Sequence, residues 1–179
     1  MNMNVCLFCG SSTRVQQQYL DLAADFGRLV ARRGDKLLYG AGNVGLMLYA
    51  AEACMNEGGY VMGVIPQFMI DRNWHLEGLS EFVVTPDMQE RKRYLIDHSD
   101  LIVVLPGGTG TLDEFFEAVV LRQLGLLDAE IVLVNPFGYY DRLLDMMQNM
   151  SDEQFLQPSD MVLYHVVENV NDVFTDRYK

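Results

Sequence analysis

Short apolar segments alternate with longer amphipathic ones along the whole chain, and this rhythm restricts the fold more than any other feature. Residues 101–105, for example, are continuously apolar, as strands are when both faces of a parallel sheet are buried. Residues 16–33 instead place apolar side chains at helical spacing. Strands that alternate with helices pack as a parallel sheet covered by helices on both faces. We therefore predict one Rossmann-like α/β domain that spans residues 1–179.

The expected elements follow one another without a linker, repeat or low-complexity tract. Residues 67–80, which contain the single tryptophan, Trp74, are expected to be irregular. The tail after Ser151 is expected to add a short strand near residues 162–164 and a final helical turn. We expect the other strands at residues 5–8, 36–39, 61–65, 81–85, 101–105 and 131–134. We expect helices at residues 16–33, 45–57, 88–98 (capped by Asp87), 111–124 and 140–150.

The composition excludes several classes of protein. The chain carries 25 acidic and 13 basic residues, a formal charge of −12, whereas a general nucleic-acid binder needs a basic face. No apolar run reaches the roughly 18 residues of a membrane span, and residues 1–4 lack the basic start of a signal peptide. We expect a cytoplasmic protein that binds neither nucleic acid nor a membrane.

Three cysteines raise the question of a redox or metal site. Cys6 and Cys9 have the C-x-x-C spacing, but no second pair of ligands follows at a spacing suited to zinc. On a strand, positions three apart point to opposite faces, so we predict buried thiols. The histidines share no metal-ligand spacing: His75, His98 and His165. We expect neither a metal nor another cofactor.

The carboxyl ends of parallel strands are where ligands of such sheets bind, beside the point at which the strand order reverses. Four segments of the chain fall there: residues 9–12, 40–45, 88–93 and 106–111. Ser11 in the first segment and Gly42 in the second are candidate substrate-binding residues.

Residues 40–45 match the G-x-G-x-x-G pattern, follow a strand and open a helix, which is the context of a dinucleotide site. However, they follow the second strand, and no acidic residue ends the third. Three interpretations remain: an NAD site, a tight turn that packs helix against strand, or a supporting part of another site.

The segment Pro106-Gly107-Gly108-Thr109-Gly110-Thr111 is the stronger indication of a ligand. Its glycines let successive backbone N–H groups converge on one point, and the following helix adds its positive N-terminal end. The Gly-Lys-Ser/Thr ending of the P-loop is absent, so we predict a single phosphate group as the ligand. The alternative is a glycine-rich turn without a ligand.

Thr111-Leu112-Asp113-Glu114 supports two interpretations. As a capping box, Thr111 caps the helix and Glu114 returns the hydrogen bond. As part of a site, Glu114 lies one turn from the phosphate loop, within reach of a sugar attached to that phosphate.

The run Glu90-Arg91-Lys92-Arg93 gathers three of the 13 basic residues. It is either a solvated helix face or a cationic cluster for an anionic substrate at the same sheet edge as the phosphate loop. Because adjacent helix positions are about 100° apart, only one or two of the three are expected to face a cleft.

Together, these segments resemble the Lonely Guy (LOG) family, whose paired signatures are R-K and P-G-G-x-G-T-x-x-E. They correspond here to Arg91-Lys92 and to residues 106–114. Further similar segments are residues 8–12, 39–42, 45–47 and 123–125, and the resemblance weakens after about Asn149.

Members of this family are cytokinin riboside 5′-monophosphate phosphoribohydrolases, often dimeric, and were once widely labelled lysine decarboxylases. The resemblance implies a homodimer that hydrolyses the N-glycosidic bond of an adenosine-type monophosphate to the free base and ribose 5-phosphate. It places the catalytic residues on Arg91 and Glu114. It places substrate-binding residues on Lys92, Gly107, Gly108, Thr109, Gly110, Thr111, Leu112 and Asp113.

Two positions depart from the family pattern. Asn73 stands where many members have Glu, and Val120 where they often have Thr, and the family likeness puts both nearer the base and sugar than the phosphate. These departures are compatible with an alternative function, a non-catalytic carrier of a nucleotide or phosphorylated cofactor. An NAD oxidoreductase is the third hypothesis.

Overall fold

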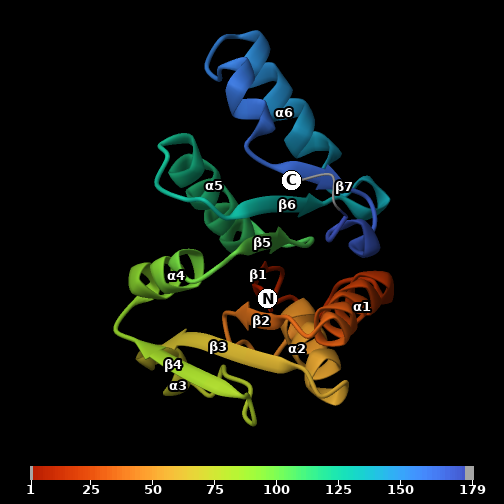
Figure 1. Ribbon diagram of the computed structural model, residues 1–179, viewed down its shortest axis with the longest axis vertical. Coiled ribbons are helices and arrows are strands. Elements are labelled where there is room, and N and C mark those ends of the chain that lie inside the picture. Colours follow the sequence, from red (N-terminus) through yellow and green to blue (C-terminus); the bar gives the residue numbers. More distant parts are fainter. Residues whose placement is uncertain (1, 176–179) are drawn as a thin grey trace.

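All seven strands in the computed structural model, which describes residues 2–175, run parallel in one sheet (Figure 1). The order is β4-β3-β2-β1-β5-β6-β7. The chain therefore builds outward from β1 to β4, returns to the centre at β5 and then builds in the other direction. The strands are β1 (Asn4–Phe8), β2 (Lys36–Tyr39), β3 (Tyr60–Pro66), β4 (Glu81–Thr85), β5 (Leu101–Val104), β6 (Glu130–Val134) and β7 (His165–Val167).

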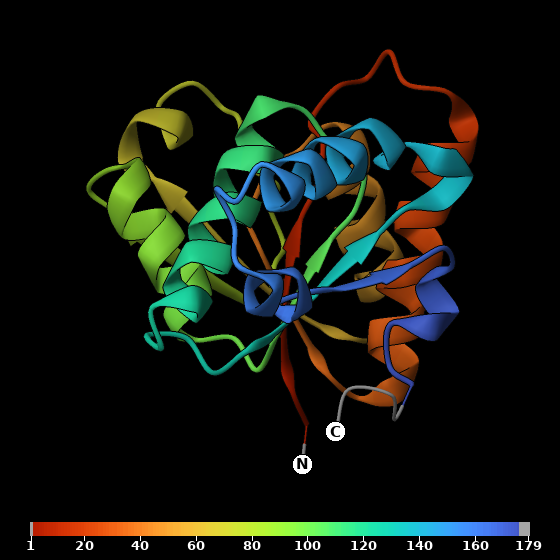
Figure 2. The ribbon, with the colours of Figure 1, turned by 90° about the horizontal axis from the view of Figure 1, so that it is seen from above.

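Helices cover both faces of this sheet, as predicted. One face is covered by α1 (Gln17–Arg33) and α2 (Gly45–Asn56), and the other by α4 (Met88–Asp97) and α5 (Thr109–Gln123) (Figures 1 and 2). The second face also packs against α6 (Asp141–Asp152), through Met147 among others. The remaining short helices are α3 (Gln67–Ile70) and the 3₁₀ turns η1 (Pro136–Gly138), η2 (Pro158–Val162) and η3 (Val170–Asp172).

The cysteines lie in the core, as predicted. Cys6 packs on the α4–α5 face of the sheet and Cys9 on the α1–α2 face, so the two sulfurs are separated by the sheet itself. Both thiols and that of Cys54 are free and buried. Burial raises the pKa of Cys54 to about 11 and that of Cys9 well above its ordinary value. These thiols are therefore protonated core groups.

Two parts of the fold differ from the sequence prediction. The segment expected to be irregular begins with one helical turn, α3. The last strand, β7, starts at His165, three residues later than expected, because η2 occupies the chain as far as Val162. The Asp160 carboxylate accepts a hydrogen bond from the Gln157 N–H at 2.8 Å. This contact stabilises η2, so the chain enters the strand conformation only after it. The expected final helical turn is present as η3.

The loops that follow β1, β2 and β5 meet where the strand order reverses. The Gly10 N–H donates to the Pro106 carbonyl at 3.0 Å, and the Leu46 N–H donates to the Gly10 carbonyl at 3.0 Å. Gly45, at φ +61°, lets the start of α2 approach this loop: a Cβ there would lie 2.5 Å from the Ser11 carbonyl carbon. The three glycine-rich segments thus form one continuous surface at the carboxyl edge of the sheet.

The contact of α1 with α2 provides a test of this packing. Alanine in place of Gly27 would put its Cβ 2.0 Å from the Ala50 carbonyl oxygen. Although alanine normally favours a helix, Gly27→Ala is expected to lower the free energy of urea unfolding by about 1–3 kcal/mol through overpacking. Gly110→Ala is the matched control, because its added Cβ would meet no atom within 4 Å; that variant should be unchanged or more stable by up to about 1 kcal/mol. Unaltered stability in Gly27→Ala would contradict the packing described here.

Candidate active site

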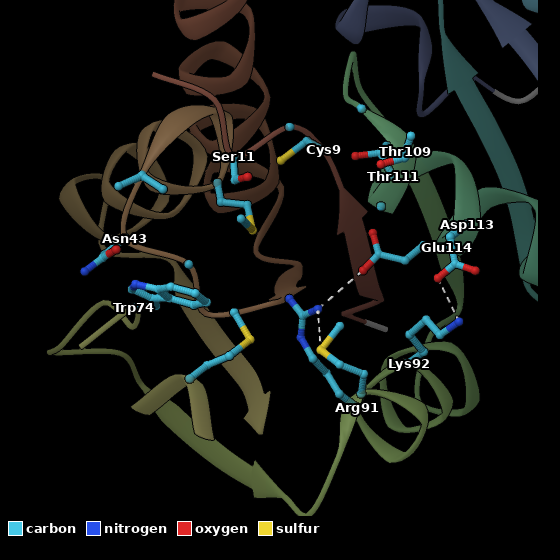
Figure 3. Close-up of a pocket in the computed structure, with 18 residues that line it drawn as sticks. Cys9, Ser11, Asn43, Trp74, Arg91, Lys92, Thr109, Thr111, Asp113 and Glu114 are labelled. Atoms are coloured by element: carbon cyan, nitrogen blue, oxygen red, sulfur yellow. Dashed lines mark hydrogen bonds and ion pairs between the residues drawn. The ribbon is translucent and has the colours of Figure 1, made fainter. Parts of the chain in front are cut away.

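A cavity of about 570 Å³ opens at this carboxyl edge (Figure 3). Its walls come from the loops after β1, β2 and β5, from the first turns of α4 and α5, and from the segment after β3. Two of the candidate residues, Gly107 and Leu112, do not line it. The candidates that do are Ser11, Gly42, Arg91, Lys92, Gly108, Thr109, Gly110, Thr111, Asp113 and Glu114.

Arg91 carries a buried positive charge into this cavity from α4. Its Nε donates to the Val64 carbonyl at 3.1 Å, and its Nη2 donates to the Gly40 carbonyl at 3.0 Å. Nη1 lies 3.6 Å from Glu114 Oε1. A Cβ at Gly40 would lie only 1.6 Å from Nη2. The first glycine of the G-x-G-x-x-G segment therefore makes room for the guanidinium.

The other two glycines of that segment also serve packing. A Cβ at Gly42 would meet the Met47 side chain at 2.5 Å, and Gly45 lets α2 pack against the loop after β1. With Gly40 beside Arg91, the three glycines of residues 40–45 allow the close packing that shapes the cavity. This matches the interpretation of the segment as a supporting part of another site.

Lys92 is also buried, but its charge is neutralised within the protein. Its Nζ lies 2.9 Å from Asp113 Oδ2 and 2.7 Å from Glu117 Oε2, so it links α4 to α5. The third basic residue of the run, Arg93, is exposed and pairs with Glu90 at 3.1 Å. The three basic residues thus have different roles: Arg91 faces the cavity, Lys92 links α4 to α5, and Arg93 is exposed to solvent.

The capping-box interpretation of Thr111 and Glu114 is wrong. Helix α5 begins at Thr109, with Gly108 as the N-cap and no side-chain cap. The helix starts two residues earlier than predicted because Gly107 lets the buried Thr111 side chain pack directly against it: a Cβ on Gly107 would lie 2.1 Å from Thr111 Oγ1. Glu114 consequently lies inside the helix, and its carboxylate faces Arg91.

The first turn of α5 is suited to an anion. Helix geometry leaves the N–H groups of that turn without intrahelical acceptors, and the positive end of the helix dipole lies there. A Cβ on Gly108 or Gly110 would meet no atom within 4 Å. Neither of these glycines nor Gly107 has a positive φ. Gly108 and Gly110 thus leave the backbone N–H groups open to a ligand. The loop does not form a nest, which needs right- and left-handed residues in succession.

Burial dominates the electrostatics of Glu114. It raises the pKa of this carboxyl to about 7, although the positive charge of Arg91 opposes the shift. A carboxyl with a pKa near neutrality exchanges protons readily at the pH of most cells, and such groups are common in catalytic sites.

The wall opposite α5 was not predicted. Figure 3 shows Trp74 and Asn43 across the cavity from Glu114, with Arg91 between the two sides. The Arg72 guanidinium carbon lies 4.9 Å from the centroid of the Trp74 ring. One feature of the sequence could have indicated this wall: the single tryptophan lies between the strand expected at residues 61–65 and the Arg91-Lys92 pair. Four apolar residues also line the cavity: Val44, Met47, Met69 and, beside Arg91 on α4, Met88.

Neither position that departs from the family pattern lines the cavity. Asn73 has φ +56°, a left-handed conformation that asparagine tolerates better than most residues, and its carbonyl accepts a hydrogen bond from Asn43 Nδ2 at 3.0 Å. Val120 is exposed on α5. Asparagine at the first position therefore suits the turn that presents Trp74.

Comparison with known proteins shows which family the chain belongs to. Residues 47–176 match the family model described as possible lysine decarboxylase. The chain is 37% identical over 169 residues to cytokinin riboside 5′-monophosphate phosphoribohydrolase LOG5 of Arabidopsis thaliana, which covers 94% of this chain and 74% of that protein. The chain belongs to the LOG family. The phosphoribohydrolase of Mycobacterium tuberculosis is another member, 39% identical over 168 residues that cover 94% of this chain and 89% of the relative.

Solved structures confirm the Rossmann-like fold of this LOG-family chain. The molybdenum cofactor binding protein of Rippkaea orientalis superposes with a TM-score of 0.73 at 19% identity, over 96% of this chain and 93% of that one. The molybdenum cofactor carrier protein of Chlamydomonas reinhardtii gives a TM-score of 0.74 at 20% identity, over 96% and 92%. At this level of identity, the likeness to carrier proteins concerns the fold alone.

Metal-binding clusters and membrane-spanning helices are both absent from residues 2–175. No group of three or more His, Cys, Asp or Glu side chains in this range is arranged to hold a metal ion. No helix in the same range has the length and apolar character needed to cross a membrane.

The raised pKa of Glu114 predicts a pH dependence of stability. Because the pKa rises from 4.5 to about 7 on folding, the folded state holds an extra proton between these values. This contribution to stability is complete below pH 4.5 and lost as the pH rises to 7. Glu114→Gln cannot ionise, so its free energy of unfolding relative to that of the natural chain should increase by roughly 3 kcal/mol across this window. Urea unfolding at several pH values measures the difference.

Glu90→Gln, a change of an exposed carboxyl on α4, is the control for that titration. A difference between Glu114→Gln and the natural chain that stays constant from pH 4.5 to 7 would contradict the buried, proton-binding state of Glu114.

Proposed function

We propose that this chain hydrolyses the N-glycosidic bond of adenosine 5′-monophosphates, N6-modified ones included, to the free base and ribose 5-phosphate. The observation that carries this proposal is the Arg91–Glu114 pair, 3.6 Å apart, in the same cavity as the open first turn of α5. Thr111 and Glu114 are three residues apart on one helix, about 4.5 Å along its axis. That spacing fits a ribose between a bound phosphate and the carboxylate. The names of the relatives in the LOG family describe this reaction.

In this proposal the nucleotide lies across the cavity from α5 to Trp74. The phosphate accepts hydrogen bonds from the N–H groups of residues 108–111, beside Ser11. The base packs against the apolar wall, where Trp74 offers an aromatic face and three methionines offer adaptable contacts. Such a wall accommodates an apolar substituent on N6 as well as plain adenine.

The carboxylate of Glu114 acts on the sugar. As the bond between C1′ and N9 breaks, the base leaves with the electron pair and positive charge develops on the ribose. Glu114 stabilises that charge and takes a proton from the attacking water, whose oxygen bonds to C1′. The proton returns to the departing base.

Arg91 stabilises this step electrostatically. Its guanidinium is fixed by the Val64 and Gly40 carbonyls, so it needs no reorganisation when charge develops. It orients the Glu114 carboxylate and faces negative charge on the leaving base. The homodimer implied by the family resemblance and the cytoplasmic location expected from the composition stay predictions.

A product assay tests the function. The purified protein is incubated with AMP and with N6-isopentenyladenosine 5′-monophosphate, and free base is separated from nucleotide by chromatography. Glu114→Gln should lower turnover at least a hundredfold, because loss of one preorganised group of this kind removes about 3–4 kcal/mol of transition-state stabilisation. Turnover by the natural chain should rise with pH up to about 7, as Glu114 ionises.

Glu90→Gln again serves as the control and should retain its activity. Near-normal turnover by Glu114→Gln would overturn the role of this residue. If neither nucleotide is cut by the natural chain while AMP still binds, the carrier function replaces the enzyme.

A further inference from the structure

Two neighbouring tyrosines after β6 donate their hydroxyls to the loop that precedes α5. Tyr139 Oη donates to the Gly107 carbonyl at 2.7 Å, and Tyr140 Oη donates to the Leu105 carbonyl at 2.8 Å. Tyr140 is buried, whereas Tyr139 is half exposed. The loop that carries the anion site is therefore held by residues 32 and 35 positions further along the sequence.

Every carbonyl from residue 105 to residue 108 accepts a hydrogen bond. Between the two tyrosine contacts, the Pro106 carbonyl accepts from the Gly10 N–H at 3.0 Å. The Gly108 carbonyl accepts from the Leu112 N–H at 3.1 Å within α5. In a planar trans peptide, the carbonyl and the following N–H point in opposite directions, and residues 2–175 contain no cis peptide bond. Each carbonyl contact thus also fixes the direction of the next N–H.

The peptide between Gly107 and Gly108 separates two cavities. Tyr139 and Gly107 line a smaller cavity of about 270 Å³ and not the main one, whereas Gly108, like Gly10 and Ser11, lines both. Because Tyr139 holds the Gly107 carbonyl from the smaller cavity, the Gly108 N–H is turned away from the Tyr139 hydroxyl, and Gly108 itself lines the main cavity.

The position of Tyr139 is itself well defined. Its ring stands edge-on to Tyr19, with centroids 5.7 Å apart, and edge-on to Tyr140, at 4.8 Å. The chain around it is fixed by Asn135, whose Oδ1 accepts from the Tyr140 N–H at 2.6 Å. The hydroxyl is therefore delivered to one place on the loop.

We propose that Tyr139 is a positioning residue for the phosphate subsite: its hydroxyl holds the Gly107 carbonyl so that the Gly108 N–H aims at the phosphate. The inference rests on the phosphate subsite of the proposed function. It extends the recognition of the substrate to a side chain that lies outside the main cavity.

The test compares Tyr139→Phe with Tyr19→Phe by calorimetric titration of inorganic phosphate, AMP and adenosine. Tyr19 is a matched control because it packs against Tyr139 but makes no hydrogen bond to the loop within the described chain. Tyr139→Phe should weaken binding of phosphate and AMP about threefold to tenfold, the range expected for one neutral hydrogen bond. Adenosine, which lacks the phosphate, should bind within about twofold of its natural affinity. If AMP is hydrolysed, its KM should rise with little change in kcat.

Several results would overturn the inference. These are unchanged phosphate affinity in Tyr139→Phe, an equal loss for adenosine, an equal loss in Tyr19→Phe, or no phosphate binding by the natural chain. A Tyr139→Phe variant that fails to fold would assign the hydroxyl a structural role and overturn it too. Because binding of inorganic phosphate and of adenosine involves no turnover of a nucleotide, a chain that cuts no nucleotide but shows the expected difference between these ligands would refute the enzyme function and leave the role of Tyr139 supported.

Discussion

The buried guanidinium of Arg91 is the interaction on which the rest of the site depends. Removing such a charge from water costs several kcal/mol unless hydrogen bonds and an opposite charge replace the lost hydration. Here two backbone carbonyls and the Glu114 carboxylate do so. This requirement explains why the residue that follows β2 must be a glycine, Gly40: the guanidinium occupies the space that a side chain would fill there. It also brings α4 and α5 together at the sheet edge where the strand order reverses.

Helix α5 supplies two opposite electrostatic features within its first two turns. Its N-terminus presents N–H groups for an anion, and Glu114 adds a carboxylate with a pKa of about 7 immediately behind them. A loop that is held from several directions lets both features keep their positions. The Gly10 N–H, the Tyr139 hydroxyl and the Tyr140 hydroxyl each fix one carbonyl. The substrate proposed here, a sugar flanked by a phosphate and a base, matches this arrangement.

The fold and the edge that carries the site could be predicted because they depend on local apolar patterns and on glycine-rich strand ends. Two features could not. The capping box of Thr111 failed because the helix start is decided by packing of Thr111 against Gly107, which a cap signature does not register. The Trp74 wall was missed because residues 67–80 have no periodicity. Their placement depends on contacts distant in sequence, such as the hydrogen bond from the Leu76 N–H to the Ala41 carbonyl at 2.9 Å.

The most direct test of the account is a crystal structure of the Glu114→Gln variant with AMP bound. The variant keeps the shape of the side chain but removes the carboxylate, so the uncleaved nucleotide should remain in the cavity. We predict phosphate oxygens on the N–H groups of residues 108–111, C1′ beside residue 114 and the base against Trp74. A nucleotide whose phosphate lies away from the first turn of α5, or whose C1′ is out of reach of residue 114, would contradict the account.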